Sequence, residues 1–173
     1  DDATDNDERD AAILASLDET LEALSGARNE EGARLADVLA GQLDEITVLT
    51  DAARASEANQ PARRRKRFEE QITELLGSTP QLSEERLNQE VALLLVKADV
   101  REETDRLYAH IAAARELLDD GGPVGRRLDF LCQEFNREGN TLCSKAAEVE
   151  LTAIGLDLKA VIDQFREQVQ NVE

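Results

Sequence analysis

The chain has 173 residues, of which 41% are hydrophobic and 34% charged, and its formal net charge is −18. A chain of this length can bury one substantial core, so we expect one main domain. No apolar run approaches the roughly 18 residues that a membrane span needs, and no charged start precedes an apolar signal segment, which argues against a membrane protein and favours a cytoplasmic one. The sequence holds no methionine, so we expect it to be part of a longer gene product.

The acidic charge is unevenly distributed. Between Asp1 and Val96 there are 22 acidic and 10 basic residues, whereas from Lys97 on there are 16 and 10. Nucleic-acid-binding proteins usually carry a basic surface, because contacts of Lys and Arg to phosphates supply most of the affinity. The overall charge therefore argues against such a protein. An acid-rich composition with few lysines instead suits a high-salt cytoplasm, where repulsion is screened.

Helical spacing of apolar residues begins after an acidic lead-in. Asp1–Asp10 has nothing to bury, so we expect it to be frayed or disordered. From there to about Ser56, apolar residues recur at helical steps, which predicts one long helix or two nearly collinear ones. Gly26, Gly32 and Gly41 each cost about 1 kcal/mol in a helix, so a break is allowed. The apolar positions are Ile13, Leu14, Leu17, Leu21, Leu24, Leu35, Val38, Leu39, Leu43, Ile46 and Leu49.

A second helix is predicted over about 62–76. Pro61 marks the turn before it, because proline disfavours the helical conformation in the preceding residue. If the second helix returns antiparallel to the first, the two form a hairpin arm. It carries the basic cluster Arg63–Arg67, which has two readings: a patch that contacts phosphates, or a set of partners for the acidic first helix. We therefore divide the chain into residues 1–80, an acidic lead-in with a helical hairpin arm, and residues 81–173, a C-terminal helical domain.

Two further helices precede a glycine-rich turn. The helix from Glu84 to about Lys97 is apolar nearly all round at Val91–Val96, which predicts a central position in a bundle. Asp99 can cap the next helix, which runs to about Asp120 and is ended by Gly121-Gly122-Pro123.

The last two helices complete an all-α chain. The first covers 125–145, and the second covers about 147–172 and has a long apolar stripe. Because there is no convincing strand, we predict an all-α fold, a bundle of long helices with an extended antiparallel helical hairpin arm. The stripe of the last helix consists of Leu151, Ile154, Leu158, Val161, Ile162, Phe165 and Val169.

The stretch 125–145 reads GRRLDFLCQEFNREGNTLCSK. Its apolar residues Leu128, Leu131, Phe135 and Leu142 recur at helical steps, which predicts a helix about 30 Å long with one buried side. The rest of its surface mixes both charge signs with an amide. Its two cysteines, Cys132 and Cys143, lie about 16 Å apart on a rigid helix, beyond disulfide reach, so we expect free structural thiols in a reducing compartment.

Together with the terminal REQVQNVE, this stretch resembles the C-terminal signature of the YicC/YloC family of bacterial stress-linked endoribonucleases. The runs RLNQEVALL (86–94) and EETDRLYAH (102–110) match in the same order, and LSGARNEEGARL (24–35) resembles the family's R-x-x-EG-x-x-L segment. The resemblance is dense from about Leu82 to Glu173. It departs from the family pattern at Thr104, where an apolar residue is usual, and at Gly139, where a small helix former is commoner.

The resemblance implies a metal-dependent endoribonuclease that acts in stress-response RNA turnover. It also implies a separate N-terminal domain that this chain lacks, RNA as the partner, a ring-like homo-oligomer (a hexamer), and contact with the RNA-degradation machinery.

Chemically useful side chains lie on two of the predicted helices. Glu103, Arg106 and His110 share one helix face, and Glu134 and Glu138 are four residues apart, so their carboxylates can converge. If the two helices pack antiparallel across the Gly-Gly-Pro turn, the two sets face each other. Carboxylates with one imidazole suit Mn²⁺ or Mg²⁺. The predicted metal ligands are Glu103, His110, Glu134 and Glu138, although glutamates at this spacing are often solvated and a helical histidine is often simply packed.

Such a metal would polarise a phosphodiester and generate hydroxide from bound water. Alternatively, His110 acts as a general acid or base, since it titrates near neutrality. An arginine can hold the phosphate through its planar guanidinium. We predict as catalytic His110, Glu134, Glu138 and Arg137, and as RNA-binding Arg126, Arg127, Asn140 and Lys145. The last two could instead cap or pair with a neighbouring helix.

Two functions from different classes fit these patterns. The first is an endoribonuclease with a divalent metal cofactor, by family resemblance, although this chain alone can be inactive without its N-terminal domain. The second is a non-catalytic helical scaffold, since long amphipathic helices with few aromatics suit an oligomerisation module that supports RNA degradation by another domain or partner. A coiled-coil adaptor with no RNA role is a weaker third, because it leaves the polar signature unexplained.

Overall fold

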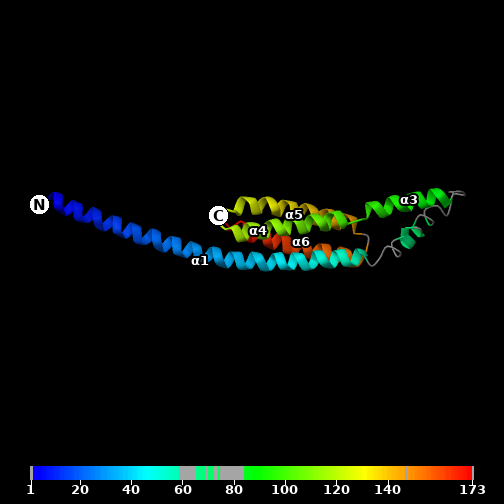
Figure 1. The fold of residues 1–173 in the computed structure, drawn as a ribbon, viewed down its shortest axis with the longest axis horizontal. Coiled ribbons are helices and arrows are strands. Elements are labelled where there is room, and N and C mark those ends of the chain that lie inside the picture. Colours follow the sequence, from blue (N-terminus) through cyan, green and yellow to red (C-terminus); the bar gives the residue numbers. More distant parts are fainter. Residues whose placement is uncertain are drawn as a thin grey trace. The chain divides into compact units, whose positions relative to one another are not determined.

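The computed structural model describes residues 2–58, 65–68, 70–71, 74, 84–146 and 148–172. Five long helices are present in these residues: α1 (Asp2–Ala58), α3 (Glu84–Lys97), α4 (Arg101–Asp120), α5 (Gly125–Lys145) and α6 (Val149–Val169) (Figure 1). No strand occurs in the described part of the chain. The predicted all-α fold is therefore confirmed. No described helix is both long and apolar enough to cross a membrane.

The chain forms two compact units, Asp1–Val38 and Leu39–Glu173. In the first unit the chain is already helical from Asp2, so the expectation of a disordered lead-in is wrong. The predicted long helix is confirmed, since α1 continues through Gly26 and Gly32 without a break. Neither glycine is required by packing, because a Cβ at either position would meet nothing within 4 Å. The apolar residues of this helix from Ile13 to Leu24 are each half or more exposed among the described residues: Ile13 58%, Leu14 61%, Leu17 50%, Leu21 53% and Leu24 53%.

The second unit holds the core. Leu39, Leu43 and Ile46 of α1 are fully buried and share one apolar cluster with residues of α4, α5 and α6. These helices run side by side (Figure 1). Polar contacts at the rim connect α1 to α4, since Arg115 Nη2 lies 2.7 Å from Asp44 Oδ1 and the Tyr108 hydroxyl donates to Asp51. The C-terminal part of α1 is thus a wall of the bundle.

The apolar periods of the last two helices position them against each other. Leu128, Leu131, Phe135 and Leu142 of α5 are buried as predicted. On α6, Leu151, Leu158, Ile162, Phe165 and Val169 are buried and Ile154 and Val161 pack against the core, so that stripe is also confirmed. The rings of Phe135 and Phe165 meet edge to face with centroids 6.0 Å apart.

A small residue brings α5 and α6 close together. A Cβ at Gly155 of α6 would lie only 2.6 Å from Cys143 Sγ and 3.1 Å from Leu142 Cδ2. Real Cβ atoms do not approach that closely, so only glycine fits here without a shift. Gly139 of α5 is less restricted, because its added Cβ would sit 3.4 Å from Lys159 Cγ, an ordinary contact. The α5–α6 contact therefore fixes how α5 presents its other face.

The turn between α4 and α5 is formed as predicted. Gly121 has φ 68° and Gly122 has φ 81°, values that side chains with a Cβ rarely adopt. At the other end of α4, Asp99 Oδ1 accepts a hydrogen bond from the Arg101 backbone N at 2.9 Å. The helix therefore has an acidic partner at its N-terminus, where a negative charge is stabilising.

The prediction for α3 is only half right. Its bounds agree, but its apolar run is not enclosed, because Leu93 is 56% exposed and Val96 is 72% exposed while Val91 is buried. Apolar residues all round a helix predict burial only if neighbours are available on every side, and the described residues do not supply them.

The predicted hairpin arm lies largely outside the described residues. In the part that is described, Arg67 Nη1 is 3.5 Å from Glu148 Oε1, ahead of α6, and Lys66 Nζ is 3.9 Å from Glu70 Oε1. Neither contact reaches the first helix. The division at residue 80 also falls where nothing is described, whereas the compact units divide after Val38.

Candidate metal centre

Helices α4 and α5 pack antiparallel along a line that we call the α4–α5 seam. Three pairs of side chains meet across it, and as the residue number rises along α4 it falls along α5. Lys145 Nζ donates to Glu103 Oε1 at 2.8 Å, Arg106 Nη1 donates to Glu138 Oε1 at 3.3 Å, and the His110 ring meets the Phe135 ring edge to face at 6.0 Å. The antiparallel arrangement on which the sequence argument depended is therefore present.

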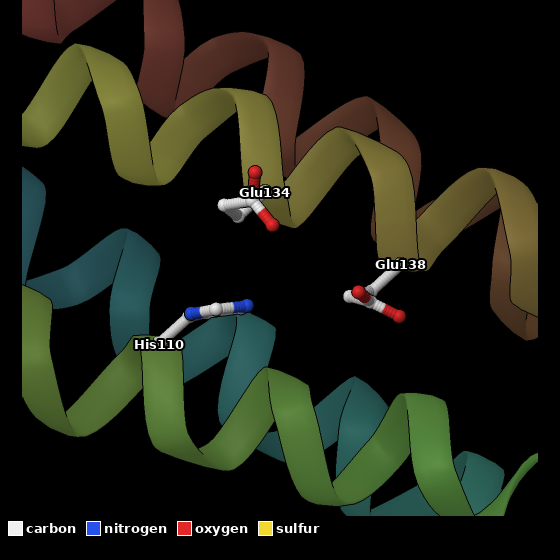
Figure 2. Close-up of side chains that lie close together, drawn as sticks. All are labelled: His110, Glu134 and Glu138. Carbon is white, nitrogen blue, oxygen red and sulfur yellow. The ribbon is translucent and has the colours of Figure 1, made fainter.

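One group of side chains on this seam has the composition of a metal site. His110 of α4 faces Glu134 and Glu138, which project from successive turns of α5 (Figure 2). One ligand atom from each residue lies within 4.8 Å of the others. We call these three residues the metal cluster. Sequence reasoning proposed four ligands, and the structure brings three of them together.

The geometry fits a small divalent cation after slight closure. An ion bound at about 2.1 Å holds opposite ligand atoms about 4.2 Å apart. The observed spread of 4.8 Å exceeds this by an amount that small side-chain rotations remove. Carboxylate oxygens with one imidazole nitrogen are the hard-to-borderline donors that Mn²⁺ and Mg²⁺ accept. The residues present therefore fit the implied metal.

Charge also favours a cation here. Glu138 is only 2% exposed, and in the described part of the chain its carboxylate contacts one cation, Arg106. Arg106 is shared, because its Nη2 lies 2.6 Å from Glu102 Oε1. The hydrogen bond to Glu138, followed by the charge of Glu102, raises the pKa of the Arg106 guanidinium, which keeps it charged. Glu134 adds a second carboxylate with only 25% of its side chain exposed, and it lies 3.7 Å from the exposed Arg137. The three carboxylates of Glu102, Glu134 and Glu138 thus share two arginines.

Glu103 lies outside the metal cluster. Its side chain is 4% exposed and forms an ion pair with Lys145, whose ammonium also donates to the backbone oxygen of Asp99 at 3.0 Å. The other carboxylate oxygen of Glu103, Oε2, is buried without a hydrogen-bond partner among the described residues. Glu103 and Lys145 therefore form a separate ion pair at the end of the seam. Their predicted roles as a metal ligand and an RNA contact remain predictions.

The remaining predicted residues are exposed on α5. Arg137 Nη1 lies 3.7 Å from Glu134 Oε2, with 67% of its side chain exposed, so it can reach a ligand held at the cluster. Asn140 is exposed on the following turn. Arg126 and Arg127 are exposed near the start of α5, about two turns before Glu134, and so do not contact the cluster.

Sequence reasoning missed two features of the site. Phe135 was assigned to the core, which is right, but it also supports the His110 ring from the side. Phe130 was not singled out, yet it is 60% exposed and lines a cavity. A signal for it existed, because Phe130 falls outside the apolar period formed by Leu128, Leu131 and Phe135.

Both cysteines are free thiols. Cys132 is buried, and desolvation together with the nearby charge of Asp129 raises its pKa to about 12. A thiol with such a pKa is a poor nucleophile near neutrality. The structural role predicted for Cys132 therefore agrees with its surroundings.

The fold and the site define an all-helical protein with a carboxylate–imidazole cluster between two antiparallel helices. Residues 52–173 match the family model described as "Endoribonuclease YicC-like, C-terminal". A protein of Haemophilus influenzae named "Probable endoribonuclease YicC" is 39% identical over 161 residues, covering 93% of this chain and 55% of the relative. A Clostridioides difficile protein of the same name is 32% identical over 158 residues, covering 91% of this chain and 54% of the relative.

The chain belongs to the YicC-like endoribonuclease family, and its residues 52–173 match the C-terminal region that the family model describes. It spans about half the length of the curated relatives that it matches. The resemblance read from the signature stretch is thereby confirmed.

Proposed function

We propose that this chain carries the divalent-cation site of an endoribonuclease and that RNA phosphodiester bonds are cleaved at the α4–α5 seam. The observation that carries the proposal is the convergence of His110, Glu134 and Glu138 within 4.8 Å. The names of the two relatives support RNA as the substrate. By the same resemblance, we propose that the reaction serves stress-response RNA turnover in the cytoplasm.

The chain's own groups divide the work as follows. Glu134 and Glu138 would hold the cation through carboxylate oxygens, and His110 would complete the set through a ring nitrogen. When bound, the cation supplies a Lewis acid for the phosphoryl oxygens and acidifies a coordinated water. Phe135 holds the imidazole plane edge-on, so the ring nitrogen stays directed at the carboxylates. Arg106 orients Glu138 through its hydrogen bond.

Arg137 binds the phosphate in this mechanism. Its guanidinium lies on the solvent side of Glu134 and offers two parallel N–H donors to phosphoryl oxygens. The charge that develops on those oxygens is then stabilised beside the cluster. In the alternative mechanism, His110 is not a metal ligand, and its imidazole instead gives a proton to the leaving oxygen.

Cleavage of a labelled RNA with Mn²⁺ tests the proposal. The full-length protein is assayed beside this chain, and His110→Ala, Glu134→Gln and Glu138→Gln are made in both. We expect each substitution to lower the cleavage rate by at least about 100-fold. Glu167→Gln, a change at an exposed glutamate of α6, is the matched control and should leave the rate unchanged. Unchanged cleavage in all three cluster variants would refute the assignment.

A second candidate function rests on the exposed apolar residues. The stripe from Ile13 to Leu24 in the first unit and Leu93 with Val96 on α3 are apolar surfaces that the described residues leave uncovered. Such surfaces are typical of contact with other subunits. The chain would then be a scaffold whose oligomer, a hexamer by family resemblance, supports RNA degradation by another domain or partner. Light scattering that shows an oligomer, together with no metal binding and no cleavage, would favour this function.

A further inference from the structure

A second feature of the α4–α5 seam lies nearer the turn. It is a cavity of about 430 Å³ formed by both helices. Its apolar lining includes Leu117 of α4 and Phe130 and Leu131 of α5, and its basic lining is Arg126 and Arg127. A cavity of this volume is large enough for a small planar ligand. We call it the Phe130 cavity.

Phe130 is an unusual surface residue in this chain. Phe135 and Phe165 are fully buried, whereas Phe130 is 60% exposed. An exposed phenyl ring offers a flat apolar face, and nucleobases stack on such faces regardless of their sequence. With few aromatic residues in the whole sequence, the position of this one beside two arginines is informative.

The arginines beside it are available. Arg126 and Arg127 precede Phe130 by one helical turn, and in the described part of the chain neither makes an ion pair or a side-chain hydrogen bond. Arg106, Arg115 and Arg137, in contrast, each lie within ion-pair distance of a carboxylate. Two guanidinium groups that have no partner among the described residues, next to an exposed ring, are the combination that holds a phosphate and its base.

The cavity also contains two carboxylates, Glu116 and Asp120 of α4. They balance the arginines, so the site does not attract phosphate chains through net charge alone. Carboxylates accept hydrogen bonds from exocyclic amino groups of bases. The occupant that uses the ring, the cations and the carboxylates together is a nucleotide whose base carries an amino group.

The register of α5 connects the cavity to the metal cluster. Arg126, Phe130, Glu134 and Glu138 recur at every fourth residue, which places them in one row along the helix. Each step advances about 6 Å, so the Phe130 ring lies one step from Glu134. On α4, Ala113 and Leu117 of the cavity follow His110 on the same side of that helix. A single strand lying along the seam would meet the cavity and the cluster in succession.

We propose that the Phe130 cavity binds one nucleotide of single-stranded RNA, with its base stacked on Phe130 and its phosphate held by Arg126 and Arg127, next to the strand's scissile bond. This proposal rests on the proposed nuclease function and adds to it a substrate class and a binding subsite. Double-stranded RNA does not fit, because its bases are already stacked and paired.

Fluorescence anisotropy tests the proposal with a short unstructured, fluorescein-labelled RNA, the full chain and EDTA, so that no cleavage occurs. We expect Phe130→Ala to weaken binding by about 5-fold to 100-fold. Phe130→Trp should retain affinity and Phe130→Leu should not, since only a ring can stack. Arg126→Gln and Arg127→Gln should each reduce the slope of log affinity against log salt by about 0.7.

Matched controls separate this subsite from general effects. Leu156→Ala changes an equally exposed apolar side chain of α6, which is 58% exposed, and Arg34→Gln removes an arginine of the first unit. Both should bind RNA as the unsubstituted chain does. Equal affinity of Phe130→Ala and the unsubstituted chain would overturn the proposal. So would a loss of affinity that appears only together with a lower molecular mass in light scattering, because Phe130 would then be covered by a second copy.

The two proposals can fail separately. His110→Ala and Glu134→Gln should abolish Mn²⁺-dependent cleavage and leave RNA affinity in EDTA within about twofold, since the cluster contacts RNA through the ion. Binding that depends on Phe130 without any metal-dependent cleavage would retain the subsite and reject the nuclease centre. Cleavage that depends on the cluster, together with RNA binding that does not depend on Phe130, would retain the nuclease centre and reject the subsite.

Discussion

The close approach of α6 to α5 gives a prediction whose magnitude follows from the structure. In Gly155→Ala the new Cβ would lie 2.6 Å from Cys143 Sγ and 3.1 Å from Leu142 Cδ2, so at least one side chain must move. Overpacking of this kind costs about 1–3 kcal/mol, and the short distance to sulfur places it in the upper half of that range. Replacing glycine in a helix recovers about 1 kcal/mol. We expect a net loss of about 1–2 kcal/mol.

Thermal unfolding followed by circular dichroism measures this loss. For a chain of this size, about 1–2 kcal/mol lowers Tm by roughly 3–6 °C. Gly139→Ala is the matched control on α5, because its Cβ would only touch Lys159 Cγ at 3.4 Å and Ile162 Cδ1 at 3.5 Å. The control should keep or raise Tm. Adding Cys143→Ala to Gly155→Ala removes the sulfur and should recover about 1 kcal/mol in a double-mutant cycle.

Equal stabilisation of the protein by Gly155→Ala and Gly139→Ala would refute this packing. In that case α5 and α6 would not be in close contact at Cys143. The face of α5 that carries Glu134 and Glu138 would then no longer be fixed by its packing.

Three further predictions concern the seam and the core. Lys145→Gln leaves the buried Glu103 carboxylate without its cation, so we expect the free energy of unfolding in urea to fall by about 3 kcal/mol. Adding Glu103→Gln should recover most of this loss, and a loss that it does not recover would contradict the pairing. Because the pKa of Cys132 is raised to about 12, a maleimide at neutral pH should label the half-buried Cys143 far faster than Cys132, and equal rates would show that Cys132 is not buried. The unfolded chain releases the Cys132 proton near the ordinary pKa of 9.0, whereas the folded chain keeps it, so the free energy of unfolding should fall as pH rises from 9.0 to about 12. The part of that fall due to Cys132 should vanish in Cys132→Ala, and an identical pH dependence in the variant would reject this linkage.

Much of the fold was predictable because it depends on local patterns. The bounds of α3, α4 and α5 followed from helical periodicity and from the glycines at 121 and 122, and the buried residues of α5 and α6 followed from their apolar stripes. These features depend on neighbours within a few residues. The antiparallel pairing of α4 and α5 followed from the short turn between them.

Features that depend on what covers a helix were less predictable. The helix that begins at Asp2 has few apolar residues in its first turns, so composition favoured disorder. The run Val91–Val96 predicted burial on all sides, yet Leu93 and Val96 are exposed. A sequence pattern indicates which residues need cover, but it does not say whether the same chain provides it.

The site was predictable in its residue types and less so in its pairings. Spacing indicated that His110, Glu134 and Glu138 could meet, and they do. Glu103 has the same chemistry and lies on the same helix as His110, but Lys145 reaches it from the far end of α5. Which carboxylate pairs with a lysine depends on the register of two helices, which no local pattern determines.

The central claim is that His110, Glu134 and Glu138 bind a divalent cation. A crystal of this protein grown with Mn²⁺ tests it most directly, through anomalous difference density collected near the manganese edge. The account predicts one strong peak within about 2.5 Å of both carboxylates and the imidazole, absent in Glu138→Gln. Density that stays empty at these residues, in a protein that cleaves RNA with Mn²⁺, would contradict it.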